Sequence, residues 1–421
     1  MEKSITGHNG NNNGGWNFIA SPITAAIAPS ANNGLASGNY DLYYYHEPTH
    51  YWRNYKENED TQHPNADPNF NLANGQGYLY ANEATTILSF TGELQAGSNG
   101  TYTVNNLSHS ATELTGFNLV GNPFACNTTI DKPCYTLSGN VISPTAHESG
   151  YVIPPCTGVM VKADEEHDNV IFTKVIPTTQ STQPNAGSLQ IALSQVPEPV
   201  EGPARDGNGE MGGVSTGSTT LALDNAIVSY TEGNALEKFV FNEDNAKLYI
   251  PQDGKDYAIV ISEGQGELPL NFKANADGQY TISVNPENVE MGYLHLIDNM
   301  TGADIDLLSA GDRGSSPAMT TEGVSYTFNA KTTDYESRFK LVFSTNTEDG
   351  PSTGSGAFAF VSDGNIVVNG EGILQVIDMM GRVVVCTDVA RNVSTQGMRP
   401  GVYVLRLVNG EKVKVQKIVI E

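Results

Sequence analysis

The last 65 residues, 357–421, restrict the fold more than any other stretch of this 421-residue chain. Apolar and polar residues alternate there in short runs, and Asp-Gly, Asn-Gly, Pro-Gly and single Gly turns separate the runs. Period-two alternation broken by such turns is typical of a small antiparallel β-sandwich. The predicted strands are Asn365–Val368, Leu374–Asp378, Val383–Cys386, Val402–Leu407 and Val413–Ile420.

The order of residues in this stretch is more specific than its fold class. Val-Ile-Asp-Met-Met-Gly-Arg-Val-Val is followed by Gly-Met-Arg-Pro-Gly-Val-Tyr-Val-Leu-Arg and by Lys-Ile-Val-Ile near the end. This succession resembles the type A C-terminal sorting domain of proteins that the type IX secretion system exports. The resemblance implies a small Ig-like domain, and its sorting motif corresponds to Gly381, Arg382, Gly401, Tyr403 and Lys417.

The same resemblance implies a partner and a location. An outer-membrane translocon would read the domain, and cleavage would leave the mature protein anchored to a Gram-negative cell surface or released. Residues 1–8 do not have the pattern of a signal peptide, so we expect further protein upstream. The sequence has no run of about 18 apolar residues, which argues against a transmembrane helix.

Residues 1–176 contain an internal duplication. The sequence Gly-Trp-Asn-Phe-Ile-Ala-Ser-Pro at 15–22 returns as Gly-Phe-Asn-Leu-Val-Gly-Asn-Pro at 116–123, 101 positions later. Gly-Tyr-Leu-Tyr at 77–80 corresponds to Gly-Val-Met-Val at 158–161, with an offset of 81. Self-similarity of this kind predicts two related β units, which we assign to residues 1–100 and 101–176. We expect Trp16 and Phe117 to pack over the later strands, and the region resembles a repeated β region of type IX cargo proteins.

The rest of the chain is also predicted to be all-β, so the whole reads as a multidomain protein of antiparallel β-sandwiches. Residues 177–220 are rich in Pro, Thr, Gln, Gly and Ser and read as a linker with one strand candidate, Ser188–Leu193. Residues 221–345 contain nine short runs of strand composition, which predict a jelly-roll or Ig-like sandwich. Residues 346–356 read as a polar hinge before the sorting domain, 357–421.

Charge excludes one class of partner. The chain has 22 basic and 47 acidic residues, a formal net charge of −25, and its Lys and Arg residues are not clustered. A surface of this kind cannot follow a phosphate backbone, so we do not expect a nucleic-acid partner.

The chain has four cysteines. Cys126, Cys134 and Cys156 could form one disulfide in an oxidising surface compartment, and the pairing stays open because more than one is compatible with the spacing. Cys386 alternates within a predicted strand, so we expect a buried thiol there.

The sharpest catalytic candidate is His46-Glu47-Pro48-Thr49-His50, which matches the His-Glu-x-x-His motif of zinc proteases. That chemistry needs a helix, so that two His bind zinc and the Glu polarises water. Here Pro48 breaks a helix, and the flanking Tyr- and Trp-rich segments have strand composition. We therefore expect a turn between two strands and no catalytic or metal site, with a zinc metalloprotease as the alternative.

The aromatic residues around this turn are the candidate ligand-binding group. Alternation places Tyr43 and Tyr45 on one sheet face, and Tyr51 and Trp52 follow the turn. Such a row can stack on sugars, whereas the structural alternative is cross-strand packing. Asp206 to Glu210 resembles half of a calcium loop, but position twelve is Gly217, so an EF-hand site fails and only a looser calcium site stays open.

These features together predict a non-catalytic secreted or cell-surface protein without a required cofactor. We expect it either to bind a glycan or a protein ligand or to hold another domain away from the cell.

Overall fold

The computed structural model describes residues 1–10, 15–56, 66–112, 114–138, 140–175, 187–195, 221–241, 244–308, 324–345, 359–362, 364–368, 372–378, 380–388, 392–409 and 412–420. Their regular structure is β-strand, apart from two 3₁₀ turns, η1 (Glu47–Thr49) and η2 (His147–Ser149), so the all-β prediction is confirmed. The described residues contain no helix that is long and apolar enough to cross a membrane. The chain divides into two compact units. The first holds residues 1–261, 273–283 and 327–334, and the second holds 262–272, 284–326 and 335–421.

The two halves of the N-terminal region each contain a four-stranded sheet, and the two sheets have the same strand order. The first half forms a four-stranded sheet of β2 (Asn17–Ala20), β5 (Gly77–Asn82), β3 (Tyr40–His46) and β4 (Tyr51–Asn54), with β1 (Glu2–Ile5) and β6 (Thr86–Ser89) as a separate pair. The second half forms the matching sheet of β8 (Phe117–Gly121), β12 (Gly158–Lys162), β10 (Cys134–Ser138) and β11 (Val141–Thr145). Its smaller sheet consists of β7 (Thr101–Leu107), β13 (Asp168–Lys174) and β9 (Thr128–Ile130).

The strand registers follow the offsets of the sequence duplication. Ala20 lies opposite Gly77 in the β2–β5 pair, and the equivalent residues Gly121 and Gly158 lie opposite each other in the β8–β12 pair. The equal registers support the predicted duplication, while the boundary between residues 100 and 101 stays a prediction. Phe117 is buried and Trp16 half-buried in one shared cluster.

The two repeats contact each other reciprocally. The Ala20 amide donates a hydrogen bond to the Cys156 carbonyl at 3.2 Å, and the Gly121 amide donates to the Gly75 carbonyl at 2.9 Å. Under the offsets of 101 and 81, Gly121 is the equivalent of Ala20 and Cys156 the equivalent of Gly75. A contact in which each partner uses the same surface is the isologous arrangement of a two-fold dimer, here within one chain.

Glycine is required where the backbones of the repeats meet. A Cβ on Gly77 would lie 2.6 Å from the Val120 carbonyl oxygen, whereas a Cβ on the equivalent Gly158 would lie no closer than 3.2 Å to its neighbours. We expect Gly77→Ala to lower the free energy of unfolding by about 1–3 kcal/mol through overpacking, and Gly158→Ala to cost less. Urea denaturation of both variants measures the difference, and equal losses would contradict the tighter clearance at Gly77.

The central region is one hydrogen-bonded sheet of eleven strands. Its order is β22-β21-β24-β19-β17-β18-β15-β14-β20-β23, with β16 paired to β18. The strands are β14 (Ser188–Gln195), β15 (Leu221–Ser229), β16 (Leu236–Glu237), β17 (Lys247–Gln252), β18 (Lys255–Ile261), β19 (Gln265–Lys273), β20 (Gly278–Glu287), β21 (Tyr293–Asp298), β22 (Ala303–Asp306), β23 (Val324–Ala330) and β24 (Phe339–Ser344).

The predicted topology of this region is wrong. β15 and β18 run parallel, with Ile227 opposite Ile259, so the sheet is mixed rather than an antiparallel jelly-roll or Ig-like sandwich. Alternation along a strand identifies the buried face but not the direction of the neighbouring strand, so the sequence pattern could not reveal the parallel pair. Strand β14 confirms the candidate at Ser188–Leu193, whereas most of the linker and the whole hinge at 346–356 lie outside the described residues.

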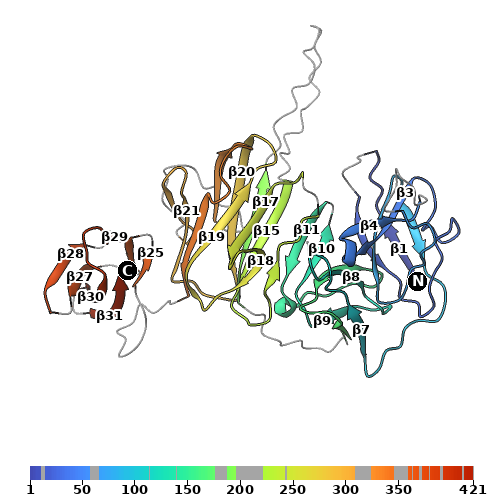
Figure 1. The fold of residues 1–421 in the computed structure, drawn as a ribbon, viewed down its shortest axis with the longest axis horizontal. Helices are drawn as coiled ribbons and strands as arrows, with labels where there is room; N and C mark the ends of the chain where they lie inside the picture. Colours follow the sequence, from blue (N-terminus) through green and yellow to red (C-terminus); the bar gives the residue numbers. More distant parts are fainter. Residues whose placement is uncertain are drawn as a thin grey trace, which may run out of the picture. The chain divides into compact units, whose positions relative to one another are not determined.

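The C-terminal region forms two small antiparallel sheets (Figure 1). One consists of β25 (Ala359–Ser362), β26 (Asn365–Val368) and β29 (Asn392–Ser394), and the other of β28 (Val383–Asp388), β27 (Ile373–Asp378), β30 (Gly401–Asn409) and β31 (Lys412–Ile420). Ile366, Leu374, Val376 and Leu405 are fully buried in their common core. The five predicted strands are confirmed, and β25 and β29 are additional.

Candidate functional site

The His-Glu-x-x-His segment is the turn of a β-hairpin. β3 ends at His46, η1 covers Glu47–Thr49, and β4 begins at Tyr51, which lies opposite His46. His50 closes the turn in a left-handed conformation with φ of 46°. The predicted turn is confirmed, and the helix on which a zinc protease places its two His ligands does not occur in residues 40–54.

The two histidines of the motif have structural contacts. His46 Nδ1 lies 2.8 Å from the Thr49 hydroxyl oxygen. Burial and the nearby Arg53 lower the pKa of His46. The His50 ring packs against the Tyr51 ring, with centroids 4.8 Å apart. Within the described ranges, no group of three His, Cys, Asp or Glu side chains could hold a metal ion.

Glu47 joins the two repeats. The residue is only 3% exposed, and its carboxylate accepts hydrogen bonds from the segment that leads into β8. The donors are the Ser108 hydroxyl at 2.6 Å and the backbone amides of Ser110 at 3.0 Å, Ala111 at 3.1 Å and Gly116 at 2.8 Å. Burial alone would raise the pKa of Glu47, but these hydrogen bonds outweigh it and lower the pKa to about 2. These hydrogen bonds attach the turn between β3 and β4 to the segment before β8.

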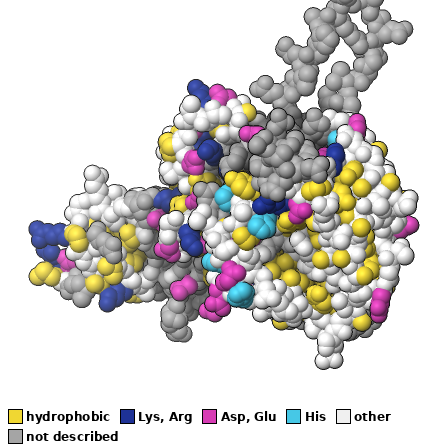
Figure 2. All heavy atoms as spheres, turned by 45° about the vertical axis from the view of Figure 1, so that its right-hand side comes forward, with side chains coloured by type: hydrophobic (Ala, Val, Ile, Leu, Met, Phe, Trp, Pro, Cys, Tyr) yellow, Lys and Arg dark blue, Asp and Glu magenta, His cyan; other side chains and the backbone are white. Residues whose placement is uncertain are grey.

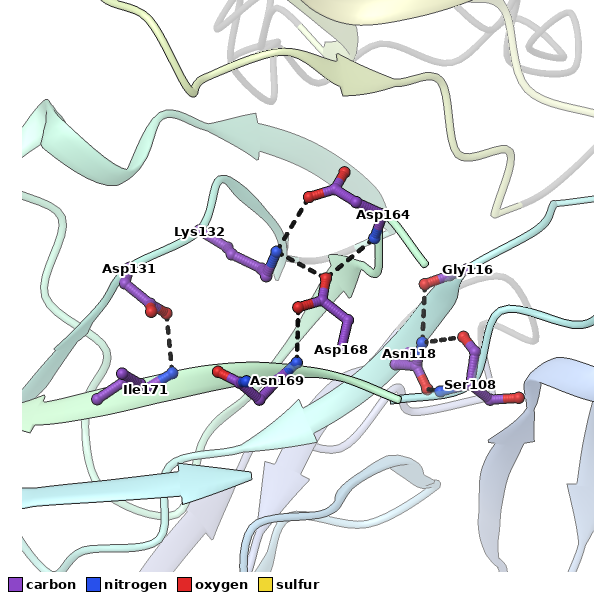
Figure 3. Close-up of polar contacts among 9 residues, drawn as sticks. All are labelled: Ser108, Gly116, Asn118, Asp131, Lys132, Asp164, Asp168, Asn169 and Ile171. Carbon is purple, nitrogen blue, oxygen red and sulfur yellow. Dashed lines mark hydrogen bonds and ion pairs between the residues drawn. The ribbon is translucent and has the colours of Figure 1, made fainter. Parts of the chain in front are cut away.

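Asn118 also holds this segment (Figure 3). Its side-chain amide donates to the Ser108 carbonyl at 2.9 Å and to the Gly116 carbonyl at 2.7 Å, and its side-chain oxygen accepts the Ser108 amide at 3.0 Å. The equivalent Asn17 donates to the Gly15 carbonyl at 2.7 Å, two residues before it, as Asn118 does to Gly116. The repeated Gly-aromatic-Asn signature of the sequence therefore reflects a local backbone clamp.

An ion pair closes the neighbouring loop of the second repeat (Figure 3). The Lys132 ammonium lies 2.8 Å from Asp168 and 3.2 Å from Asp164. Asp168 also accepts the backbone amides of Asp164 at 3.0 Å and Asn169 at 2.7 Å. These carboxylates serve the loop itself, since their contacts are with one lysine and with backbone amides.

Most of the aromatic candidates are part of the core. Tyr45 is buried, and Trp52 lies 5.2 Å from the Tyr45 ring and 6.0 Å from the Phe241 ring between centroids. The Tyr43 ring packs edge-on against the Trp16 ring, with centroids 6.0 Å apart. Tyr51 differs from these residues because it is 48% exposed. Of the four predicted ligand-binding residues, Tyr51 is exposed, Tyr43 and Trp52 are half-buried and Tyr45 is buried, and their role in binding stays a prediction.

The cysteines are free thiols in the structure. Cys134 and Cys156 are buried, and burial raises the pKa of Cys134 to about 12. The prediction of a buried thiol at Cys386 is wrong: the residue is exposed, because it pairs with Gln375 on the side of β28 that faces away from the core. The Asp206–Glu210 segment lies outside the described residues.

The residues of the predicted sorting motif shape the C-terminal sheets. Gly381 has φ of 80° in the turn between β27 and β28, where Arg382 Nε donates to Asp378 at 2.8 Å. Gly401 starts β30 with φ of 155°, and the buried Tyr403 donates its hydroxyl proton to the Arg399 carbonyl at 2.8 Å. Lys417 is exposed on β31 opposite Val404.

Residues 362–421 match the family described as secretion system C-terminal sorting domain. No curated protein matches the chain. The resemblance drawn from the motif residues is thus confirmed, and the domain marks the chain for export by type IX secretion to the outer-membrane surface or the medium. The match covers the C-terminal region alone and leaves the role of residues 1–361 open.

Proposed function

We propose that this chain is a non-catalytic protein whose duplicated β region acts as a structural spacer once type IX secretion has exported it. The observation that carries the proposal is the hydrogen bonding of Glu47. Glu47 belongs to the His-Glu-x-x-His motif, which is the catalytic candidate of the sequence. Its carboxylate accepts hydrogen bonds from four residues of the second repeat. Together with the reciprocal amide bonds, these hydrogen bonds attach the first repeat to the second.

A second candidate function is ligand binding at the exposed ring of Tyr51. This ring packs on His50 at the end of the β3–β4 hairpin, so one of its faces is held by the protein. An exposed aromatic ring with a fixed orientation can stack on a sugar ring at a low cost in conformational entropy. The spacer is favoured because a single exposed ring offers far less contact area than the four-residue group predicted from the sequence.

A glycan array separates the two functions. For a spacer, we expect the purified chain to give no glycan signal above that of a Tyr51→Ala variant. A signal that falls about tenfold or more in Tyr51→Ala would make the chain an adhesin instead. Val175→Ala, which also removes an exposed apolar side chain, is the control for a loss of nonspecific apolar binding to the array.

Metal analysis tests the zinc-protease alternative. We expect no stoichiometric zinc in the purified chain, because His46 contacts Thr49 and Glu47 is held by backbone amides. Inductively coupled plasma spectrometry of the chain and of His46→Ala, with a casein-cleavage assay, measures this. Zinc that is bound one-to-one and lost in His46→Ala would overturn the non-catalytic proposal.

A further inference from the structure

The sheet formed by β28, β27, β30 and β31 has an apolar face that is not part of the core. Leu374, Val376, Leu405 and Leu407 point into the core, so their neighbours along each strand point the other way. We call that side the outer face. Its apolar residues are Ile373, Ile377, Val383, Val402, Val404, Val408, Val415 and Val419, and its charged residues are Arg406, Lys417 and Asp388, which lies opposite Ile373 at one edge.

Four of the eight apolar side chains of the outer face are exposed to solvent, and the other four are half-buried. Val415 is 62% exposed, Val419 58%, Val383 50% and Ile373 43%. Residues 362–421 hold six of the sixteen large apolar side chains that are exposed among the described residues, although they are a seventh of the chain. Contiguous exposed apolar surface on a soluble protein marks an interaction site, so this concentration indicates a partner.

The charge of the domain indicates the chemistry of that partner. Residues 362–421 contain seven basic and six acidic residues, whereas residues 1–361 contain 15 basic and 41 acidic residues. The domain therefore has a formal charge of +1 and the rest of the chain −26. Arg406 donates to Gln375 at 2.9 Å in the middle of the outer face, and Lys417 lies exposed beside it. In Figure 2 the C-terminal end of the chain, at the left, has Lys and Arg side chains next to hydrophobic ones.

A second copy of the chain is a poor occupant, because its outer face would bring the same two cations and Asp388 as the one carboxylate of the described face to meet them. The family match indicates a better occupant, since a secretion-system sorting domain has to be recognised by the secretion machinery. We propose that the outer face is the surface by which the secretion receptor binds this chain, and that the receptor offers an apolar surface bordered by carboxylates. This inference rests on the export function of the domain.

Secretion of the full chain from a type IX-competent bacterium tests the assignment. Val415→Thr with Val419→Thr keeps β-branched side chains in β31 and removes apolar surface from the outer face. We expect the amount of chain outside the cell to fall at least tenfold, with retention in the periplasm. The matched control is Ile87→Thr with Leu221→Thr, at strand residues that are 55% and 53% exposed outside the domain, and it should be secreted normally. Lys417→Glu should also reduce secretion, and Lys417→Arg should not.

Three outcomes would overturn the proposal. Normal secretion of Val415→Thr with Val419→Thr, while a chain without residues 362–421 stays inside the cell, would reject the outer face and leave the export function intact. Secretion of the shortened chain would instead reject the export function itself. Sedimentation showing a dimer that the Thr variant loses, or binding to phosphatidylglycerol vesicles that it loses, would assign the face to a second copy or to a membrane. Equal unfolding temperatures of the variant and the natural chain exclude misfolding as the cause of a secretion defect.

Discussion

Replacing Glu47 with alanine is expected to lower the free energy of unfolding of the first unit by about 3–5 kcal/mol. The change removes a buried acceptor and leaves the amides of Ser110, Ala111 and Gly116 and the Ser108 hydroxyl without their partner. Each unsatisfied buried donor costs about 1–3 kcal/mol, part of which water entering the new cavity recovers. Urea unfolding followed by tryptophan fluorescence measures the loss, since both tryptophans, Trp16 and Trp52, lie in this unit.

Two variants control this experiment. Glu47→Gln keeps one acceptor oxygen and should lose less stability than Glu47→Ala. Glu165→Ala removes an exposed carboxylate from the same unit and should change stability by less than about 0.5 kcal/mol. A Glu47→Ala variant as stable as Glu165→Ala would mean that the carboxylate does not join the repeats.

The same residue predicts the response to acid. The pKa of Glu47 is about 2 in the folded chain against an ordinary value of 4.5, so folding favours its ionised form. The stabilisation is therefore complete above about pH 4.5 and is lost as the pH falls from there toward 2. Glu47→Gln should remove this part of the acid sensitivity, which unfolding midpoints between pH 5 and pH 3 would reveal.

The positions of the strands could be predicted from the sequence, but which strands pair with each other could be predicted only in part. The alternation in 357–421 and the repeated motifs in 1–176 correctly indicated where the strands lie, since the period of side-chain direction is local. Topology is not local. β15 pairs in parallel with β18 across a connection that contains β16 and β17, and no periodicity in either strand encodes that choice.

The candidate site shows the same division. Pro48 and the strand-like flanks were enough to predict a turn at His46–His50, and the turn is present. The role of Glu47 could not be predicted, because its donors lie at least 61 positions away in the second repeat. The one local signal was the Asn of the Gly-aromatic-Asn motif, whose side chain folds back onto the segment that binds Glu47. Cys386 was assigned to the wrong face, because the register shift that follows Val376 in β27 changes which residues of β28 face inward.

The second unit contains a buried ion pair that neither alternation nor a motif indicated. Arg338 is 2% exposed and Asp298 is fully buried. Arg338 Nε donates to Asp298 Oδ1 at 3.1 Å and a terminal nitrogen donates to Oδ2 at 2.8 Å. The Tyr326 hydroxyl at 3.1 Å and the Met300 amide at 3.0 Å complete the environment of the carboxylate. Burial alone would raise the pKa of Asp298, but Arg338 and these donors lower it, so the carboxylate is ionised at neutral pH.

Arg338→Met should therefore destabilise the second unit by about 3–5 kcal/mol, because it leaves an ionised carboxylate buried without a cation. Adding Asp298→Asn to Arg338→Met should recover part of that loss, since the amide carries no charge. Its single oxygen can still accept the Met300 amide, and its NH2 group can donate to the Tyr326 hydroxyl oxygen. Arg382→Met is the matched control: its partner Asp378 lies 2.7 Å away, but Arg382 is 71% exposed, so the loss should stay below about 1 kcal/mol. Thermal unfolding of the three variants compares the same chemical pair in two environments. Equal losses for Arg338→Met and Arg382→Met would show that burial of the Asp298–Arg338 pair adds nothing to its contribution.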